Sequence, residues 1–173
     1  VRSRGLGDVY KRQVQIVKSN IVKDVLENIE RYSAANNHYV FEITETIEMD
    51  QIPAVQNVFK EFVKNDFRFA IDDFGTGYSN YGYMRDRTFD IVKVDRSFVT
   101  DIDKLKDNYL MVSFIIKMAH EMGLHVCIEG VETKEELSCV KRLGADYIQG
   151  YYYGKPVCLQ DFEEQHLKRF VLG

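Results

Sequence analysis

The feature that most constrains the fold is a regular alternation of short β-rich runs with longer stretches of helical character. The β-rich runs occupy positions 39–44, 67–72, 91–95, 125–129 and 147–149. Apolar spacing and flanking residues predict helices over 16–29, 55–62, 110–122, 133–142 and 160–169. Strands that alternate with helices of about ten residues or more form βαβ units. The sequence therefore predicts an α/β fold with a parallel sheet.

The choice between an open and a closed sheet depends on the turns that follow the strands. No Gly-x-Gly-x-x-Gly follows a predicted strand, and no Gly-x-x-x-x-Gly-Lys-[Ser/Thr] occurs in the sequence. Dinucleotide-binding and P-loop folds need one of these turns to hold phosphate groups. A closed (β/α)₈ barrel is therefore favoured by elimination.

Composition narrows the classes of partner and the compartment. The net charge of −4 provides no global positive field, so we expect no nucleic-acid polymer as a partner. No apolar run approaches the roughly 20 residues of a spanning helix, so we expect no membrane segment in this chain. Three cysteines without Cys-x-x-Cys spacing suit a reducing compartment. We expect a cytoplasmic location, and leave open a membrane anchor in N-terminal regions of the parent protein.

Residues 1–13 differ in character from the rest of the chain. They are basic, poor in apolar residues, and show neither a helical nor a strand period. We interpret them as a foreign segment, such as translated sequencing-adapter read-through, with a native basic arm as the alternative. Residues 14–173 contain no long linker, low-complexity tract or repeat, so they are predicted to form one domain.

Each of the five predicted strands ends in an ionisable or amide side chain. The strand period of two places each of these residues in phase with a small or apolar residue two positions earlier. The five residues are Glu42, Asp72, Lys93, Glu129 and Gln149. If these faces point into a barrel, the side chains converge at its mouth, where barrel enzymes place their chemistry. The alternative interpretation is that each residue is a solvated strand end.

The carboxylates of this set indicate a metal site. Three inward carboxylates and the adjacent Asp73 would repel one another in a water-poor cleft, which raises their pKa values or demands a cation. All-oxygen ligands without His or Cys favour Mg²⁺, Mn²⁺ or Ca²⁺. Consecutive Asp72 and Asp73 at a glycine-rich turn can face one site, so that Asp72 bridges two ions and Asp73 holds one. Gly75 and Gly77 provide the backbone freedom that such a turn needs.

Five motifs stand in order along the chain. They are Phe41-Glu-Ile-Thr-Glu45, Ala70-Ile-Asp-Asp-Phe-Gly-Thr-Gly-Tyr-Ser79, Val92-Lys-Val-Asp-Arg-Ser-Phe-Val99, Glu129-Gly-Val-Glu-Thr133 and Gln149-Gly-Tyr-Tyr-Tyr-Gly-Lys-Pro156. This series resembles that of the EAL domain, the cyclic-di-GMP phosphodiesterase family of bacteria. The resemblance covers residues 14–173, which correspond to the C-terminal two-thirds of that domain.

The resemblance implies both a fold and a reaction. The family's fold is a modified, TIM-like (β/α)₈ barrel in which one strand runs antiparallel to the rest. Its activity is the metal-dependent hydrolysis of cyclic di-GMP to linear pGpG in second-messenger signalling. We therefore expect an N-terminally truncated barrel that contains about the last five of the eight strands.

The resemblance also assigns metal ligands and their supports. It implies that Glu42 and Asp72 bind Mg²⁺ or Mn²⁺, with Asp72 bridging two ions and Asp73 holding the second ion. Glu45 matches the glutamate that braces the loop after Asp73. Asp95 is expected to support the site from a position near Lys93.

The remaining site residues take catalytic roles by the same resemblance. Lys93 is expected to lie beside the attacking water and the scissile phosphate of cyclic di-GMP. Glu129 is expected to position that water or the second ion, and Gln149 to complete the polar wall. The loop over 74–80 matches a segment linked to metal binding and dimer formation, so we expect a homodimer in the complete protein.

Two ligands of the family pattern do not have a recognisable match. The Glu-Ala-Leu string is absent, and an expected asparagine would fall near position 10, inside the segment 1–13. Because a (β/α)₈ barrel needs about 250 residues, we expect the parent protein to be a phosphodiesterase and the isolated chain to be inactive. Two alternatives are a non-catalytic cyclic-di-GMP receptor, and a dimerisation module that uses the Asp73 loop and the apolar helix over 110–122.

Overall fold

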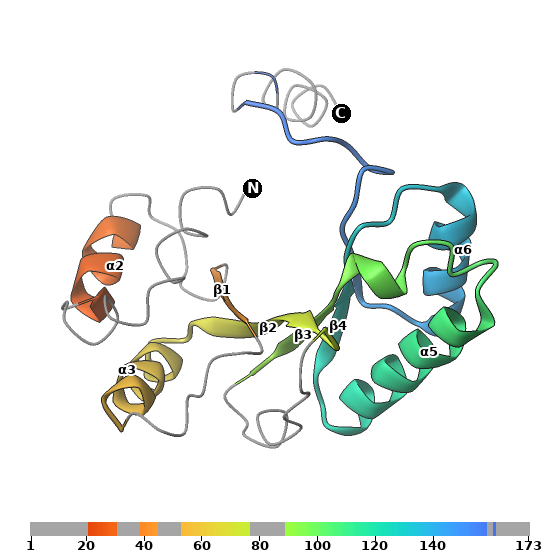
Figure 1. Cartoon of the computed structure of the whole chain (residues 1–173). Coiled ribbons are helices and arrows are strands. Elements are labelled where there is room, and N and C mark those ends of the chain that lie inside the picture. Colours follow the sequence, from red (N-terminus) through yellow and green to blue (C-terminus); the bar gives the residue numbers. More distant parts are fainter. Residues whose placement is uncertain (1–20, 31–38, 45–52, 77–88, 159–160, 162–173) are drawn as a thin grey trace, which may run out of the picture.

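A computed structural model of the chain describes residues 21–30, 39–44, 53–76, 89–158 and 161 (Figure 1). Within them, five strands form one sheet, and each strand pairs in parallel with the next along the chain. The strands are β1 (Val40–Thr44), β2 (Arg68–Phe74), β3 (Ile91–Val94), β4 (His125–Ile128) and β5 (Tyr147–Ile148). The predicted α/β class with a parallel sheet is confirmed.

Among the described residues, one helix precedes the first strand and others connect the strands. They are α2 (Ile21–Glu30), α3 (Pro53–Lys64), the 3₁₀ helix η3 (Arg96–Phe98), α5 (Lys106–Glu121) and α6 (Lys134–Leu143). The four α-helices overlap predicted helices, whereas the 3₁₀ helix was not predicted from the sequence. Figure 1 shows α2 and α3 near one end of the sheet and α5 and α6 near the other. Segment 1–13 lies outside the described residues, as does the predicted helix over 160–169 except Asp161, which is helical.

The core begins with aromatic rings where β1 and β2 meet α3. Ring centroids in this group lie 4.8–6.2 Å apart, close enough for tilted and edge-to-face packing. The rings belong to Phe41, Phe59, Phe62, Phe67 and Phe69. β3 is buried along its whole length, which explains its nearly continuous apolar sequence. The core therefore holds β3, the central strand of the sheet, in a fixed position.

Helix α5 extends the same core to β4. Its buried side chains recur at helical spacing and belong to one cluster with Val126 and Ile128 of β4. They are Val112, Ile115, Ile116 and Ala119. Each of these side chains is at most 3% exposed, so the pattern over 110–122 reflects packing against the sheet on this side of the helix.

A buried carboxylate that the sequence analysis missed fixes the loop between β4 and α6. Glu136 is 6% exposed, and its oxygens accept hydrogen bonds from the backbone amides of Asp101, Glu132 and Thr133 at 2.9–3.2 Å. The Thr133 hydroxyl accepts one from the Glu136 amide, which completes a capping box. Burial alone would raise the pKa of Glu136, but these amides lower it, so the carboxylate remains charged.

A second carboxylate joins three elements at the amino ends of β4 and β5. Asp146 Oδ2 accepts a hydrogen bond from the Val126 amide at 2.8 Å and lies 2.8 Å from His120 Nε2. Asp146 Oδ1 lies 3.5 Å from His125 Nδ1. Burial alone would raise the pKa of Asp146, but the contacts with His120 and Val126 lower it below its ordinary value.

Asp146→Asn is expected to lower the free energy of unfolding by about 1 kcal/mol near pH 7, because charge-assisted hydrogen bonds are lost. A carboxyl whose pKa falls on folding contributes stability above its unfolded pKa of about 3.9. That contribution is lost as the pH falls through the lower folded value. Urea unfolding should therefore show a gap between wild type and variant that closes below about pH 4. A gap that is constant across this range would contradict the assignment.

Candidate active site

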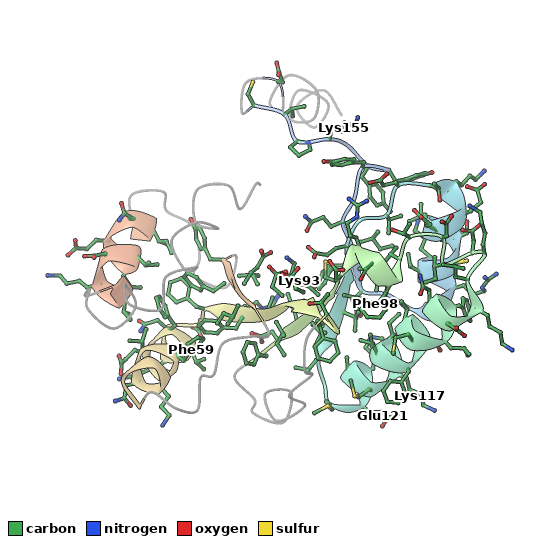
Figure 2. The ribbon with its side chains drawn as sticks, in the orientation of Figure 1. Phe59, Lys93, Phe98, Lys117, Glu121 and Lys155 are labelled. Carbon is green, nitrogen blue, oxygen red and sulfur yellow. The ribbon has the colours of Figure 1, made fainter. Side chains whose placement is uncertain are left out.

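Lys93 lies at the centre of a cluster of carboxylates at the carboxyl ends of the strands (Figure 2). Its Nζ donates a hydrogen bond to Asp72 Oδ1 at 2.7 Å and lies 2.9 Å from Glu42 Oε1 and 2.8 Å from Glu129 Oε1. The three carboxylates come from β1, β2 and the residue after β4. Because neighbouring parallel strands place residues of the same phase side by side, four of the five predicted strand-end residues meet at one point.

Charge in this cluster is unbalanced. Burial alone would lower the pKa of Lys93, but hydrogen bonds to Asp72 and Glu129 and the charges around it raise that pKa well above its ordinary value. Burial raises the pKa of Glu129, and the charges of Asp72 and Glu42 add to the rise against the opposing effect of Lys93. One ammonium thus faces three carboxylates, so the cluster has an excess of negative charge that a bound cation would reduce.

A β-bulge brings a fourth carboxylate to the same place. The pairing of β2 with β3 runs Ile71 opposite Val92 and then Phe74 opposite Val94, so β2 contains one extra residue. Asp73 sits in this bulge with a φ of 55°, which is uncommon for a residue with a side chain. The sequence analysis ended this strand at position 72, and the bulge carries it on to Phe74.

Three carboxylates lie close enough together to share a cation. Asp72, Asp73 and Glu129 each offer an oxygen, and these oxygens lie within 4.8 Å of one another. Glu42, which the sequence analysis groups with the two aspartates, reaches the cluster through its ion pair with Lys93. A set of carboxylate oxygens without His or Cys fits the hard cations Mg²⁺ and Mn²⁺. The residues present are therefore compatible with the metal that the sequence predicts.

The loop that carries Glu129 depends on a glycine. Gly130 has a φ of 72°, and a Cβ atom there would lie 2.3 Å from Cβ of Arg96 in η3. Any larger residue would have to move the backbone and with it Glu129. The sequence analysis did not single out Gly130, although its position directly after a strand-end carboxylate was a usable signal.

The other predicted site residues have different surroundings. Gln149 is exposed, one residue beyond β5, and its backbone amide donates to the Ile128 carbonyl at 2.8 Å. The Asp95 carboxylate accepts a hydrogen bond from the Ser97 amide at 3.0 Å and so caps η3, a contact that the sequence analysis did not foresee. Glu45 lies outside the described residues, as does the loop over 74–80 beyond position 76.

Cys127 lies in the strand register opposite Lys93 but does not have a reactive thiol. Burial, with a further contribution from the Glu129 charge, raises the pKa of Cys127 to about 12. The thiol therefore remains protonated at neutral pH. This agrees with a packing role rather than that of a nucleophile.

Lys93→Met is expected to lower the free energy of unfolding by about 3 kcal/mol in metal-free buffer, because the partly buried carboxylates lose their counter-charge. Lys64→Met is the matched control, since the Lys64 side chain is 76% exposed and its pair with Glu61 is 4.0 Å long. That control should change stability by less than about 0.5 kcal/mol. Urea unfolding with a chelator present measures both variants. Equal stability would show that the ammonium does not hold the cluster together.

Comparison with known proteins places this arrangement in a family. The sequence model of the EAL domain matches residues 9–156. The chain is 34% identical over 146 residues to the probable cyclic di-GMP phosphodiesterase PdeA of Escherichia coli strain K12, which covers 84% of this chain and 20% of PdeA. Among solved structures, the EAL enzyme Bd1971 in its cAMP and cyclic-di-GMP bound form superposes with a TM-score of 0.80 at 33% identity, over 87% of this chain and 40% of that chain.

A manganese complex is also among the similar structures. The manganese and cyclic-di-GMP complex of BlrP1 from Klebsiella pneumoniae superposes with a TM-score of 0.74 at 26% identity, over 82% of this chain and 36% of that chain. The chain thus spans about a fifth of PdeA and less than half of either structural relative. The parallel sheet is part of a TIM-barrel-like fold, and the chain belongs to the EAL domain family.

Proposed function

We propose that the protein of which this chain is part hydrolyses one phosphodiester bond of cyclic di-GMP, giving linear pGpG, with Mg²⁺ or Mn²⁺ as cofactor. The observation that carries this proposal is that oxygens of Asp72, Asp73 and Glu129 lie within 4.8 Å of one another, with the Lys93 ammonium in contact with Asp72 and Glu129. Support also comes from the name of PdeA and from the ligands of the structural relatives. The carboxyl ends of barrel strands are where this fold places catalysis.

The residues that would hold the metal ions are Asp72, Asp73 and Glu42. Bound ions supply a water of lowered pKa and neutralise charge on the phosphate. Glu129 Oε1 lies 2.8 Å from Lys93 Nζ, and we assign Glu129 to hold the attacking water or to complete the second ion's ligands. The acidic cluster alone would repel a dianionic dinucleotide, so substrate binding needs the cations.

Lys93 contributes a fixed positive charge to the reaction. Its raised pKa keeps Nζ protonated at any physiological pH, and its burial keeps the ammonium in one place. A charge that is already oriented stabilises negative charge that develops on the phosphate oxygens without further reorganisation. We place Gln149 at the rim as a polar contact for the water, since it follows β5 at the same end of the sheet.

The exposed side of α5 supports a homodimer in the complete protein. Leu110, Met111 and Phe114 are 54%, 46% and 57% exposed, although the opposite side of this helix is buried in the core. Neighbouring large apolar residues on one surface are typical of interfaces between proteins.

No helix of the described residues is long and apolar enough to cross a bilayer. The cytoplasmic location remains a prediction from the sequence.

Two other functions use the same residues differently. A cyclic-di-GMP receptor would bind the dinucleotide without cutting it, and a dimerisation module would need neither metal nor substrate. A receptor has no need for carboxylates that keep an excess of negative charge around one buried ammonium, so the Lys93 cluster favours the metal-dependent enzyme. Supply of cyclic di-GMP and Mn²⁺ to the full-length protein separates the enzyme from the other two functions, because only the enzyme releases pGpG.

Asp72→Asn is expected to reduce the release of pGpG by the full-length protein at least a hundredfold, because a neutral amide holds a hard cation less well than a carboxylate. Asp103→Asn is the matched control, since Asp103 is exposed on the loop before α5, and it should retain wild-type turnover. Chromatography of the nucleotide products measures both. Full activity of Asp72→Asn would contradict the metal assignment.

The same assay applied to the 173-residue chain tests whether it works alone. Its described sheet has five strands, and the family resemblance places two further ligands upstream of them. We therefore expect turnover by the isolated chain to be undetectable under conditions in which the full-length protein is active. Equal turnover by both would show that the site is complete without those ligands.

A further inference from the structure

We propose that the short helix η3 sets the spacing of the carboxylate cluster, and that Phe98 acts as a positioning residue for Asp73. The helix follows β3 directly, and its two ends touch the loops that carry Asp73 and Glu129. The proposal rests on the proposed function to the extent that these carboxylates bind metal ions. Phe98 is labelled in Figure 2, together with Lys93.

The turn after Asp73 requires two left-handed residues, of which only Gly75 adopts this conformation readily. Asp73 has a φ of 55° and Gly75 a φ of 95°, so two of three consecutive residues are left-handed. Thr76 returns to this turn, because its amide and its hydroxyl both donate to the Asp73 carbonyl, at 3.3 Å and 2.8 Å. A left-handed aspartate persists where the surrounding structure holds it.

The ring of Phe98 lies directly against this turn. A Cβ atom built on Gly75 would be 2.8 Å from Cε2 and 3.0 Å from Cζ of Phe98, so the ring edge contacts the Gly75 backbone. Phe98 is partly buried and packs against the hydrophobic core. The ring thus limits movement of the chain two residues after Asp73.

At its other end, η3 touches the loop that carries Glu129. Cβ of Arg96 occupies the space that a side chain at position 130 would need. Asp73 and Glu129 offer oxygens within 4.8 Å of each other. Asp73 belongs to β2 and Glu129 follows β4, and these two strands are not neighbours in the sheet. A rigid spacer between their loops fixes the distance between the two carboxylates.

The helix is itself well anchored. The Asp95 carboxylate caps its start, and the Asn108 side-chain amide donates to the Ser97 carbonyl at 3.4 Å and to the Thr100 carbonyl at 3.1 Å. Val99, which follows the helix, is fully buried. These contacts lie outside the carboxylate cluster, so η3 keeps its place independently of a metal ion.

Phe98→Leu keeps an apolar side chain but removes the planar ring from Gly75. Without metal, hydrogen–deuterium exchange in a peptide that contains 73–76 is expected to become about tenfold faster, because the Thr76 amide opens more often. Phe59→Leu is the matched control, since Phe59 is a core ring packed against Phe69, away from η3. It should leave exchange at 73–76 unchanged. Unchanged exchange in Phe98→Leu would overturn the proposal.

Binding of Mn²⁺, followed by the electron paramagnetic resonance signal of the free ion, tests the consequence for the site. Phe98→Leu is expected to weaken Mn²⁺ binding by about tenfold, and Phe98→Ala by more, while Phe59→Leu binds as wild type. Equal binding by Phe98→Leu and Phe59→Leu would refute the positioning role and leave the proposed function standing. Wild-type protein that binds no Mn²⁺ would refute the metal site itself, and the spacing role with it.

Circular dichroism spectra of the three variants establish that each remains folded before these comparisons are made. If Phe98→Ala unfolds, the milder Phe98→Leu still decides the result. Faster exchange at 73–76 with wild-type Mn²⁺ affinity would also overturn the proposal, because the loop would then be looser without any effect on the carboxylates.

Discussion

The interaction on which the rest of the site depends is the contact of one buried ammonium with three carboxylates. Lys93 lies on a strand that is buried along its whole length, so its charge cannot be solvated and must be neutralised by neighbours. The parallel register supplies those neighbours from three other strand ends. The excess of negative charge that remains is a reason for the cluster to bind cations.

The loops around this cluster pack closely against η3 through glycine residues, which leave no space for a side chain at the contacts. Gly130 has no room for a side chain beside Arg96, and the ring of Phe98 lies against Gly75 on the other side of η3. The buried Glu136 ties the loop after β4 to the backbone of Asp101. These contacts hold the carboxylates at fixed distances without using any atom of the carboxylates themselves. Rigid support of this kind is what a site for metal and phosphate needs.

Much of this arrangement follows from the sequence because it depends on local periods. The strands, their order and the phase of Glu42, Asp72, Lys93 and Glu129 all follow from alternation by two and from helical spacing. The bulge at Asp73 could not be predicted, since an extra residue in one strand is defined only against its partner. The cap at Asp95 was missed because the family resemblance gave Asp95 a supporting position near Lys93, whereas its carboxylate accepts a hydrogen bond from the Ser97 amide. The capping box at Glu136 had a local sequence signal, Thr133-x-x-Glu136, which the sequence analysis did not use.

The central claim is that the carboxylates around Lys93 form a divalent cation site. Crystals of the full-length protein grown with Mn²⁺ and measured at the manganese absorption edge would locate the ion directly. We expect an anomalous peak at about 2.2 Å from carboxylate oxygens of Asp72 and Asp73, with Glu129 or Glu42 beside it. Manganese bound only at other positions, or no manganese at saturating concentration, would contradict the claim.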